Sequence, residues 1–179
     1  MRHLEAAAMI EGAGFDRLVP ATWADLGCGD GTFTLALASL LAPGSLVHAI
    51  DRDPAAIAQL PAAGSTVRIA KHVDDFRRSW PFSTVLDGIL MANSLHYVQD
   101  QRAFLQSCLP RVSPAGRFVI VEYDTTFANP WVPFPINRAR LTELCADIGP
   151  VTMLGTRRST FRRAKLYAAL VTRRSSDIS

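Results

Sequence analysis

Three glycines and two aspartates lie together between Asp25 and Gly31, in the segment DLGCGDG (the glycine loop), and residues of these types could hold a small ligand. Gly27, Gly29 and Gly31 permit a tight turn and let a ligand approach the backbone closely. Asp25 and Asp30 add two carboxylates, which would repel a pyrophosphate group. The spacing is GxGxG, whereas the dinucleotide fingerprint is GxGxxG. The glycine loop therefore favours a ligand with cationic groups over NAD.

Asp51 and Asp53 form a second acidic pair, at the end of the next predicted strand. Asp51 follows Gly31 by twenty positions, where a carboxylate can accept hydrogen bonds from both ribose hydroxyls of a nucleoside. Asp53 precedes Pro54, which is the arrangement of a helix N-cap followed by proline at the first helical position. The alternative is that both acids only cap this helix. Because Asp53 by itself can cap this helix, Asp51 remains available to bind the ligand.

A third acidic pair, Asp74 and Asp75, follows the third predicted strand and precedes Phe76. One of these carboxylates could accept a hydrogen bond from an adenine amino group, with the phenyl ring packing nearby. The alternative is that both are ordinary exposed loop acids. Together the three acidic positions predict a nucleoside that carries positive charge.

Short apolar runs alternate along the chain with segments of helical periodicity. This alternation predicts an α/β domain with a mainly parallel sheet and helices on both faces. Ligands of such sheets bind beyond the carboxyl ends of the strands, which is where all three acidic positions fall. The predicted strands are 21–26, 46–50, 66–70, 85–91, 117–121, 151–156 and 165–172, and the predicted helices are 3–12, 32–41, 54–60, 100–109 and 136–146.

Length and composition suit one globular domain over residues 1–179, with 1–20 as a short N-terminal cap and 173–179 as a flexible tail. Hydrophobic residues make up 49% of the chain and charged residues 20%, which excludes a disordered protein. The three cysteines are far apart and no His/Cys cluster has ligand spacing, so neither a disulfide framework nor a metal site is predicted. The uncharged run 31–50 contains a Pro-Gly turn, and no signal peptide is recognisable. We therefore expect a cytoplasmic protein without a membrane partner.

At these residues the sequence resembles the class I S-adenosylmethionine-dependent methyltransferase family, particularly its small-molecule, ubiquinone/menaquinone-type branch. The glycine loop matches the family's first motif at every position, and Asp51 matches its ribose-binding acid. The runs 92–98 and 109–117 resemble the segment that flanks the methionine part of the cofactor and the turn before the fifth strand. The resemblance covers about residues 21–122 and implies a Rossmann-like, seven-stranded, mainly parallel sheet whose last strand is antiparallel.

The resemblance also implies the cofactor, which is S-adenosylmethionine, and the product, which is S-adenosylhomocysteine. The ammonium and sulfonium groups of S-adenosylmethionine are cations of the kind that the acidic positions favour. The residues implied in binding it are Asp25, Gly27, Cys28, Gly29, Gly31, Asp51, Arg52, Asp74, Asp75, Phe76, Ala92, Asn93 and Ser94.

Methyl transfer is an in-line displacement at the sulfonium carbon, so the protein mainly orients the reactants. An acceptor that must lose a proton needs a base, and His96 and Tyr123 are the candidates because each follows a predicted strand. The alternative is that His96 only walls the pocket. The irregular loop 123–135 is stiffened by prolines, and its aromatic groups suit a small, partly apolar acceptor. The predicted substrate contacts are Tyr97, Trp131 and Phe134.

Positive charge is concentrated at the C-terminal end. Residues 157–179 hold seven Arg or Lys and one Asp, a net charge of +6. An RNA or protein methyltransferase that uses a basic 157–165 loop is therefore one alternative. Because no appended binding domain accompanies this loop, nucleic acid is not the expected partner. A non-catalytic S-adenosylmethionine-binding protein is a second alternative. The acceptor, the methylated atom (O, N, S or C) and the choice between monomer and homodimer stay open.

Overall fold

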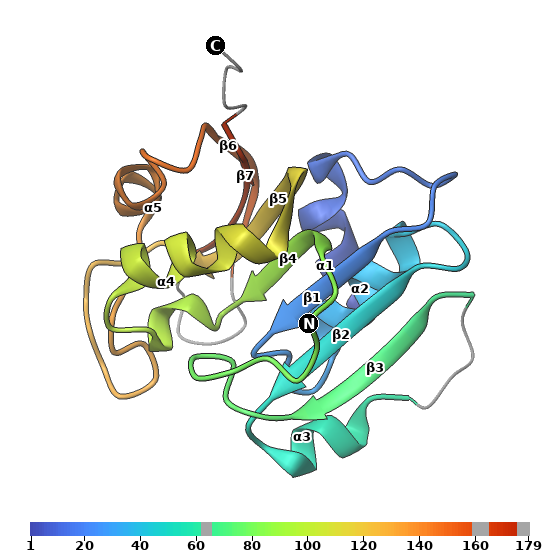
Figure 1. Cartoon of the computed structure of the whole chain (residues 1–179). Helices are drawn as coiled ribbons and strands as arrows, with labels where there is room; N and C mark the ends of the chain where they lie inside the picture. Colours follow the sequence, from blue (N-terminus) through green and yellow to red (C-terminus); the bar gives the residue numbers. More distant parts are fainter. Residues whose placement is uncertain (62–65, 159–164, 175–179) are drawn as a thin grey trace.

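The computed structural model describes residues 1–61, 66–158 and 165–174, and a seven-stranded sheet forms its centre (Figure 1). The first five strands in sequence run parallel, and the last is antiparallel to both of its neighbours. The mainly parallel sheet that the sequence pattern predicted is confirmed, and so are the seven strands and antiparallel last strand that the family resemblance implied. In order across the sheet the strands are β3 (Arg68–Val73), β2 (Leu46–Asp51), β1 (Thr22–Leu26), β4 (Leu86–Ala92), β5 (Val112–Tyr123), β7 (Lys165–Thr172) and β6 (Val151–Arg158).

Helices cover both faces of the sheet (Figure 1), because the buried side chains of the strands alternate between two apolar clusters. Ile89 and Met91 of β4 join the cluster that contains residues of α4 and α5, whereas Leu90 joins the cluster of α1 and α2. The helices are α1 (His3–Ile10), α2 (Thr32–Leu40), α3 (Pro54–Gln59), α4 (Gln101–Cys108) and α5 (Arg138–Leu144), with short 3-10 turns η1 (Glu11–Ala13), η2 (Leu95–Tyr97) and η3 (Leu109–Arg111).

Side-chain caps set the starts of three helices. Asp53 accepts a hydrogen bond of 2.9 Å from the backbone N–H of Ala55, so the predicted cap of α3 is confirmed. Asp100 caps α4 and Asn137 caps α5 in the same way. Within the described residues, no helix is long and apolar enough to cross a membrane.

The structure differs from the predicted elements mainly at the C-terminal end. Arg157 and Arg158 belong to β6, where they pair with β7, and so are not part of a basic loop. Arg162 and Arg163 of that predicted loop lie outside the described residues. Arg173, assigned to a flexible tail, donates hydrogen bonds to the carbonyls of Leu109 and Val112, so its position is fixed by tertiary contacts. Residues 175–179 of the tail are not described.

Two further boundaries were wrong in the prediction. The fifth strand begins at Val112 because this residue pairs with Leu86 across a register shift, which the turn-like sequence of 113–116 conceals. The third strand extends to Val73 because its last residue pairs with Asp51 of β2. Long-range pairing, rather than local sequence, therefore sets the ends of both strands.

Candidate functional site

A cavity of about 430 Å³ lies at the carboxyl ends of β1, β2, β3 and β4. Its lining includes residues that follow β1 and β4, the neighbouring strands between which the strand order reverses and where open α/β sheets bind their ligands. Five carboxylates and two guanidinium groups surround it. In the described part of the chain, no three His, Cys, Asp or Glu side chains are grouped so as to hold a metal ion. The lining residues are Gly27, Cys28, Gly29, Asp30, Phe33, Asp51, Arg52, Asp53, Asp74, Asp75, Phe76, Arg77, Ala92, Asn93, Ser94 and Tyr97.

The three loop glycines have positive φ but serve different purposes. A Cβ atom at Gly27 would lie 2.5 Å from the Cβ of Ser94, and one at Gly31 would lie 2.0 Å from Leu60, so packing requires both glycines. At Gly29, where φ is +53°, no other atom of the described residues would come within 4 Å of such a Cβ. Gly29 is therefore the position where the backbone itself is open to a ligand.

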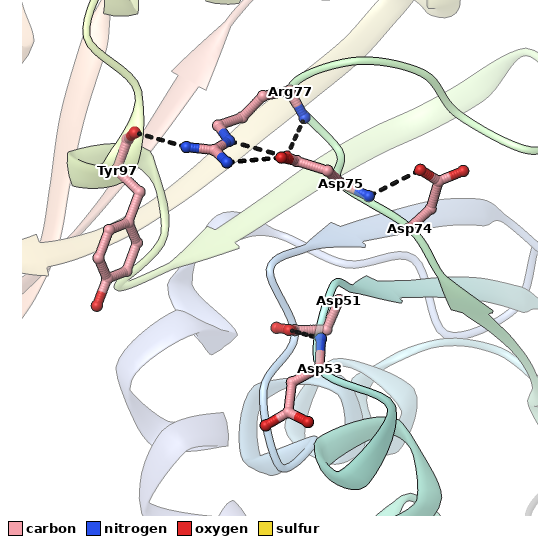
Figure 2. A network of polar contacts seen from close by, with 6 residues as sticks. All are labelled: Asp51, Asp53, Asp74, Asp75, Arg77 and Tyr97. Carbon is pink, nitrogen blue, oxygen red and sulfur yellow. Dashed lines mark hydrogen bonds and ion pairs between the residues drawn. The ribbon is translucent and has the colours of Figure 1, made fainter.

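Asp51 connects the glycine loop to the end of β2. Its Oδ2 accepts a hydrogen bond of 2.8 Å from the backbone N–H of Gly29. Its Oδ1 accepts one of 2.9 Å from the N–H of Asp53, which Figure 2 shows. A carboxylate has about four acceptor positions, so both oxygens keep capacity for the hydroxyls of a ligand. The carboxylate thus holds the loop in place while it faces the cavity.

The structure distinguishes the two acids that follow β3. Arg77 donates to both oxygens of Asp75 at 2.8 and 2.6 Å, and this pairing lowers the pKa of the Asp75 carboxyl (Figure 2). From the described side chains and backbone, Asp74 accepts one hydrogen bond, of 2.7 Å, from the N–H of Asp75. Asp74 is therefore the acid with more acceptor capacity left for a ligand.

Asn93 adds a polar group from the end of β4. Its backbone is left-handed, with φ of +56°, and its N–H donates to the carbonyl of Val121 at 2.7 Å. Its side-chain Oδ1 is buried and has no hydrogen-bond partner within the described ranges. A buried acceptor without a partner beside a cavity indicates that a ligand supplies the missing donor.

Two residues predicted to bind the ligand lie outside the cavity lining. Gly31 is the N-cap residue of α2, and the Leu60 side chain lies against it. Asp25 is fully buried beneath the loop, where its Oδ2 accepts a hydrogen bond of 2.6 Å from the Thr34 hydroxyl. Burial raises the pKa of Asp25 to about 7, and the nearby charge of Asp51 adds to this increase.

Asp25 leads to a prediction about stability and pH. Its pKa rises from 3.8 to about 7 on folding, so between these values the folded state binds more protons than the unfolded state. The contribution of Asp25 to stability should therefore fall as the pH rises through this window, by at most about 1.4 kcal/mol per pH unit. In urea unfolding, the free energy of unfolding of Asp25→Asn should increase relative to that of the wild type between pH 4 and pH 7. Above pH 7 the difference between the two proteins should stay constant. A difference that does not change with pH would contradict the raised pKa.

Of the residues predicted to act in catalysis or to contact the substrate, only Tyr97 is among the described residues that line the cavity. Tyr97 lines it, but His96 is buried at 1% exposure behind this wall. Tyr123 lies at the end of β5, with its ring centroid 6.3 Å from that of His96. Trp131 and Phe134 are 62% and 36% exposed and lie outside the cavity lining. Phe134 is nevertheless connected to the site, because its N–H donates to the His96 carbonyl at 3.1 Å.

Sequence reasoning did not identify several residues of this region. Phe33 and Arg77 both line the cavity. In the sequence, only their positions indicate this: Phe33 lies shortly after the glycine loop, and Arg77 lies shortly after the pair Asp74 and Asp75. Glu122 is fully buried and accepts hydrogen bonds from His96. A charged residue within the apolar run of the fifth strand was the signal that could have revealed it.

Comparisons with known proteins identify the family of the chain and solved structures that share its fold. A family model described as a methyltransferase domain matches residues 24–118, more than half of the chain. The plantazolicin methyltransferase BpumL in complex with S-adenosylhomocysteine has a TM-score of 0.68 at 15% identity, covering 96% of this chain and 83% of that one. A comparison with curated protein sequences gives no match.

Two further solved structures share the fold at low identity. The YcgJ protein from Bacillus subtilis has a TM-score of 0.69 at 12% identity, with 97% of this chain and 99% of that one covered. The N-methyltransferase NodS from Bradyrhizobium japonicum has a TM-score of 0.68 at 16% identity, with 96% and 93% covered.

Proposed function

Since the chain belongs to the methyltransferase domain family and its cofactor is S-adenosylmethionine, we propose that it methylates a small, partly apolar acceptor. When bound, the cofactor supplies an electrophilic methyl group on a sulfonium. The residues of the chain then have to bind it, orient the acceptor and keep water away from the methyl group.

The cavity has groups that suit the ribose, the adenine and the ammonium group of the cofactor. We assign the two ribose hydroxyls to Asp51, and the adenine amino group to Asp74 with Phe76 beside the ring. We assign the ammonium group to Asn93, because its Oδ1 is a buried acceptor that has no partner among the described residues. Gly29 leaves the backbone open for close approach. Asp51 and Asp74 are two of the five carboxylates around the cavity, and this acidic lining would disfavour a phosphate-bearing ligand.

The acceptor is assigned to the Tyr97 side of the cavity, between η2 and the 123–135 loop. The observation that carries this proposal is the hydrogen bond from the N–H of Phe134 to the His96 carbonyl, which fastens the loop to η2. Trp131 and Phe134 are the exposed apolar side chains that this loop offers to an acceptor. His96 and Tyr123 are the groups proposed to take a proton from the acceptor.

Replacing Trp131 by alanine should impair turnover and leave cofactor affinity within about 0.5 kcal/mol, because the side chain lies outside the cavity lining. Release of S-adenosylhomocysteine with a panel of phenols, thiols and amines identifies an acceptor and measures turnover. Calorimetry with S-adenosylhomocysteine measures cofactor affinity. Phe127→Ala is the matched control, because Phe127 is 81% exposed on the same loop and should matter less. Equal turnover in both variants and the wild type would contradict the assigned acceptor position.

A polymer acceptor would give the opposite pattern. Arg157 forms an ion pair of 2.7 Å with Glu5 of α1, so part of its charge serves the contact between α1 and β6. Replacing Arg157, Arg158, Arg162 and Arg163 by serine should change little for a small neutral acceptor. Loss of activity in this variant, with Trp131→Ala unaffected, would favour an RNA or protein methyltransferase.

A further inference from the structure

A buried histidine–glutamate pair lies behind the cavity wall. Glu122 in β5 is fully buried, and its two carboxylate oxygens bind one residue. Oε1 accepts a hydrogen bond of 3.1 Å from the backbone N–H of His96, and Oε2 lies 2.6 Å from its Nδ1. Glu122 therefore holds both the backbone and the imidazole ring of His96.

This pair is not explained by the packing of the sheet. The neighbours of Glu122 on β5, Ile120 and Val121, are fully buried apolar residues, and burying a carboxylate among such residues is costly. The Nε2 of His96 is also buried and has no hydrogen-bond partner within residues 1–61, 66–158 and 165–174. A buried ionisable pair with one unused nitrogen is typical of a site where function requires the cost.

The location of the pair connects it to the proposed acceptor site. The ring centroid of His96 lies 4.3 Å from that of Tyr97, which lines the cavity and is 38% exposed. The backbone carbonyl of His96 holds the acceptor loop through Phe134. The imidazole is therefore close to a side chain that lines the cavity, while it is itself outside the lining.

The chemistry of the pair selects one form of the imidazole. An ionised carboxylate only accepts hydrogen bonds, so the Nδ1 that faces Glu122 must carry the proton. In neutral His96 this leaves Nε2 as a bare acceptor, which is the form that a general base needs.

We propose that Glu122 is a positioning residue that fixes His96 as the Nδ1–H tautomer, so that Nε2 takes the proton of the acceptor. This inference rests on the proposed function. As the acceptor heteroatom bonds to the methyl carbon, the carbon–sulfur bond breaks and its electron pair goes to sulfur. The acceptor proton passes to Nε2, and Glu122 stabilises the imidazolium until the proton leaves to water. Tyr97 must move aside for the acceptor to reach Nε2.

The first test determines the tautomer of His96 and needs no methyl acceptor. Nitrogen-15 NMR of histidine-labelled full chain with S-adenosylhomocysteine should show His96 with its proton on Nδ1 and a bare Nε2 at neutral to mildly basic pH. Glu122→Gln should move the proton to Nε2, because an amide can donate to Nδ1. His48 and His72, whose nitrogens lie 2.9 Å apart, are the internal control and should not change. A wild-type His96 protonated on Nε2, alone or on both nitrogens, would overturn the proposal whether or not the variant folds.

Turnover then separates a base from a merely structural pair. The probes are phenol and 4-nitrophenol, at a pH where only the second is ionised and so needs no base. For phenol, Glu122→Gln and His96→Gln should lower kcat roughly 100-fold with KM for S-adenosylmethionine unchanged. For 4-nitrophenol, both variants should stay within about threefold of the wild type. Equal losses with both probes would reduce the pair to a structural role. No product from either probe with the wild type would count against the small aromatic acceptor, and the tautomer would still decide the role of Glu122.

Discussion

Valine at position 29 is expected to abolish binding of S-adenosylhomocysteine while the chain stays folded. A Cβ at Gly29 points into space that no described residue fills within 4 Å, on the wall of the cavity. The branched side chain of valine would therefore occupy the volume where a ligand meets the backbone. Affinity in calorimetry should fall roughly 100-fold or more, which is about 2.7 kcal/mol.

Backbone strain is the other effect of this substitution, and it needs its own control. The φ of Gly29 is +53°, which costs a β-branched residue on the order of 1–3 kcal/mol of stability. Gly44→Val carries the same strain, because the φ of Gly44 is +85° and its nearest neighbour is Pro20, outside the cavity. Gly44→Val should lose similar stability in thermal unfolding and bind normally. If Gly29→Val also binds normally, the glycine loop is a turn and not a ligand site.

Asp51→Ala should weaken cofactor binding by roughly 2–4 kcal/mol, since a charged acceptor loses its partners. The change removes the proposed ribose contact and also the 2.8 Å hydrogen bond that holds the N–H of Gly29. Calorimetry with S-adenosylhomocysteine measures the loss, and thermal unfolding checks that the variant is folded.

Asp53→Ala is the matched control for Asp51, because the two acids are two residues apart on the same loop. Asp53 caps α3 through the N–H of Ala55, so its loss should cost about 1 kcal/mol of stability and little affinity. If the Asp53 variant binds the cofactor more weakly than the Asp51 variant, the two roles are reversed, with Asp53 as the ligand-binding acid and Asp51 as the helix cap. Normal binding by a folded Asp51→Ala chain would leave Asp51 as a loop acid.

Local sequence was enough to predict the alternation of strands and helices along the chain and the approximate place of the cavity. Short apolar runs alternate with helical segments, and parallel strands bring their carboxyl ends to one edge. The positions that follow β1, β2 and β3 must therefore converge. For this reason the strand pattern by itself brings Gly29, Asp51 and the pair Asp74 and Asp75 to one site, and all four line the cavity. The cap role of Asp53 was equally local, because a helix N-cap depends on residues three positions apart or fewer.

Only the tertiary structure decided which chemically similar residues face the ligand. Gly31 and Gly29 look alike in sequence, but Leu60 fills the space beside one and leaves the other open. Asp74 and Asp75 differ because the guanidinium of Arg77 lies against the second. The buried location of Asp25 beneath the loop likewise depends on the packing of α2 on β1.

The histidine–glutamate pair shows this limit most clearly. His96 and Glu122 are 26 positions apart, and they meet because β4 and β5 are neighbours in register. Sequence periodicity places each residue near a strand end but carries no information about which side chains touch across the sheet. Side-chain contacts between distant segments depend on packing and on the competition for hydrogen-bond partners. The sequence alone therefore determined the fold class and the cofactor, and the packing of the folded chain decided how each group of the site is held.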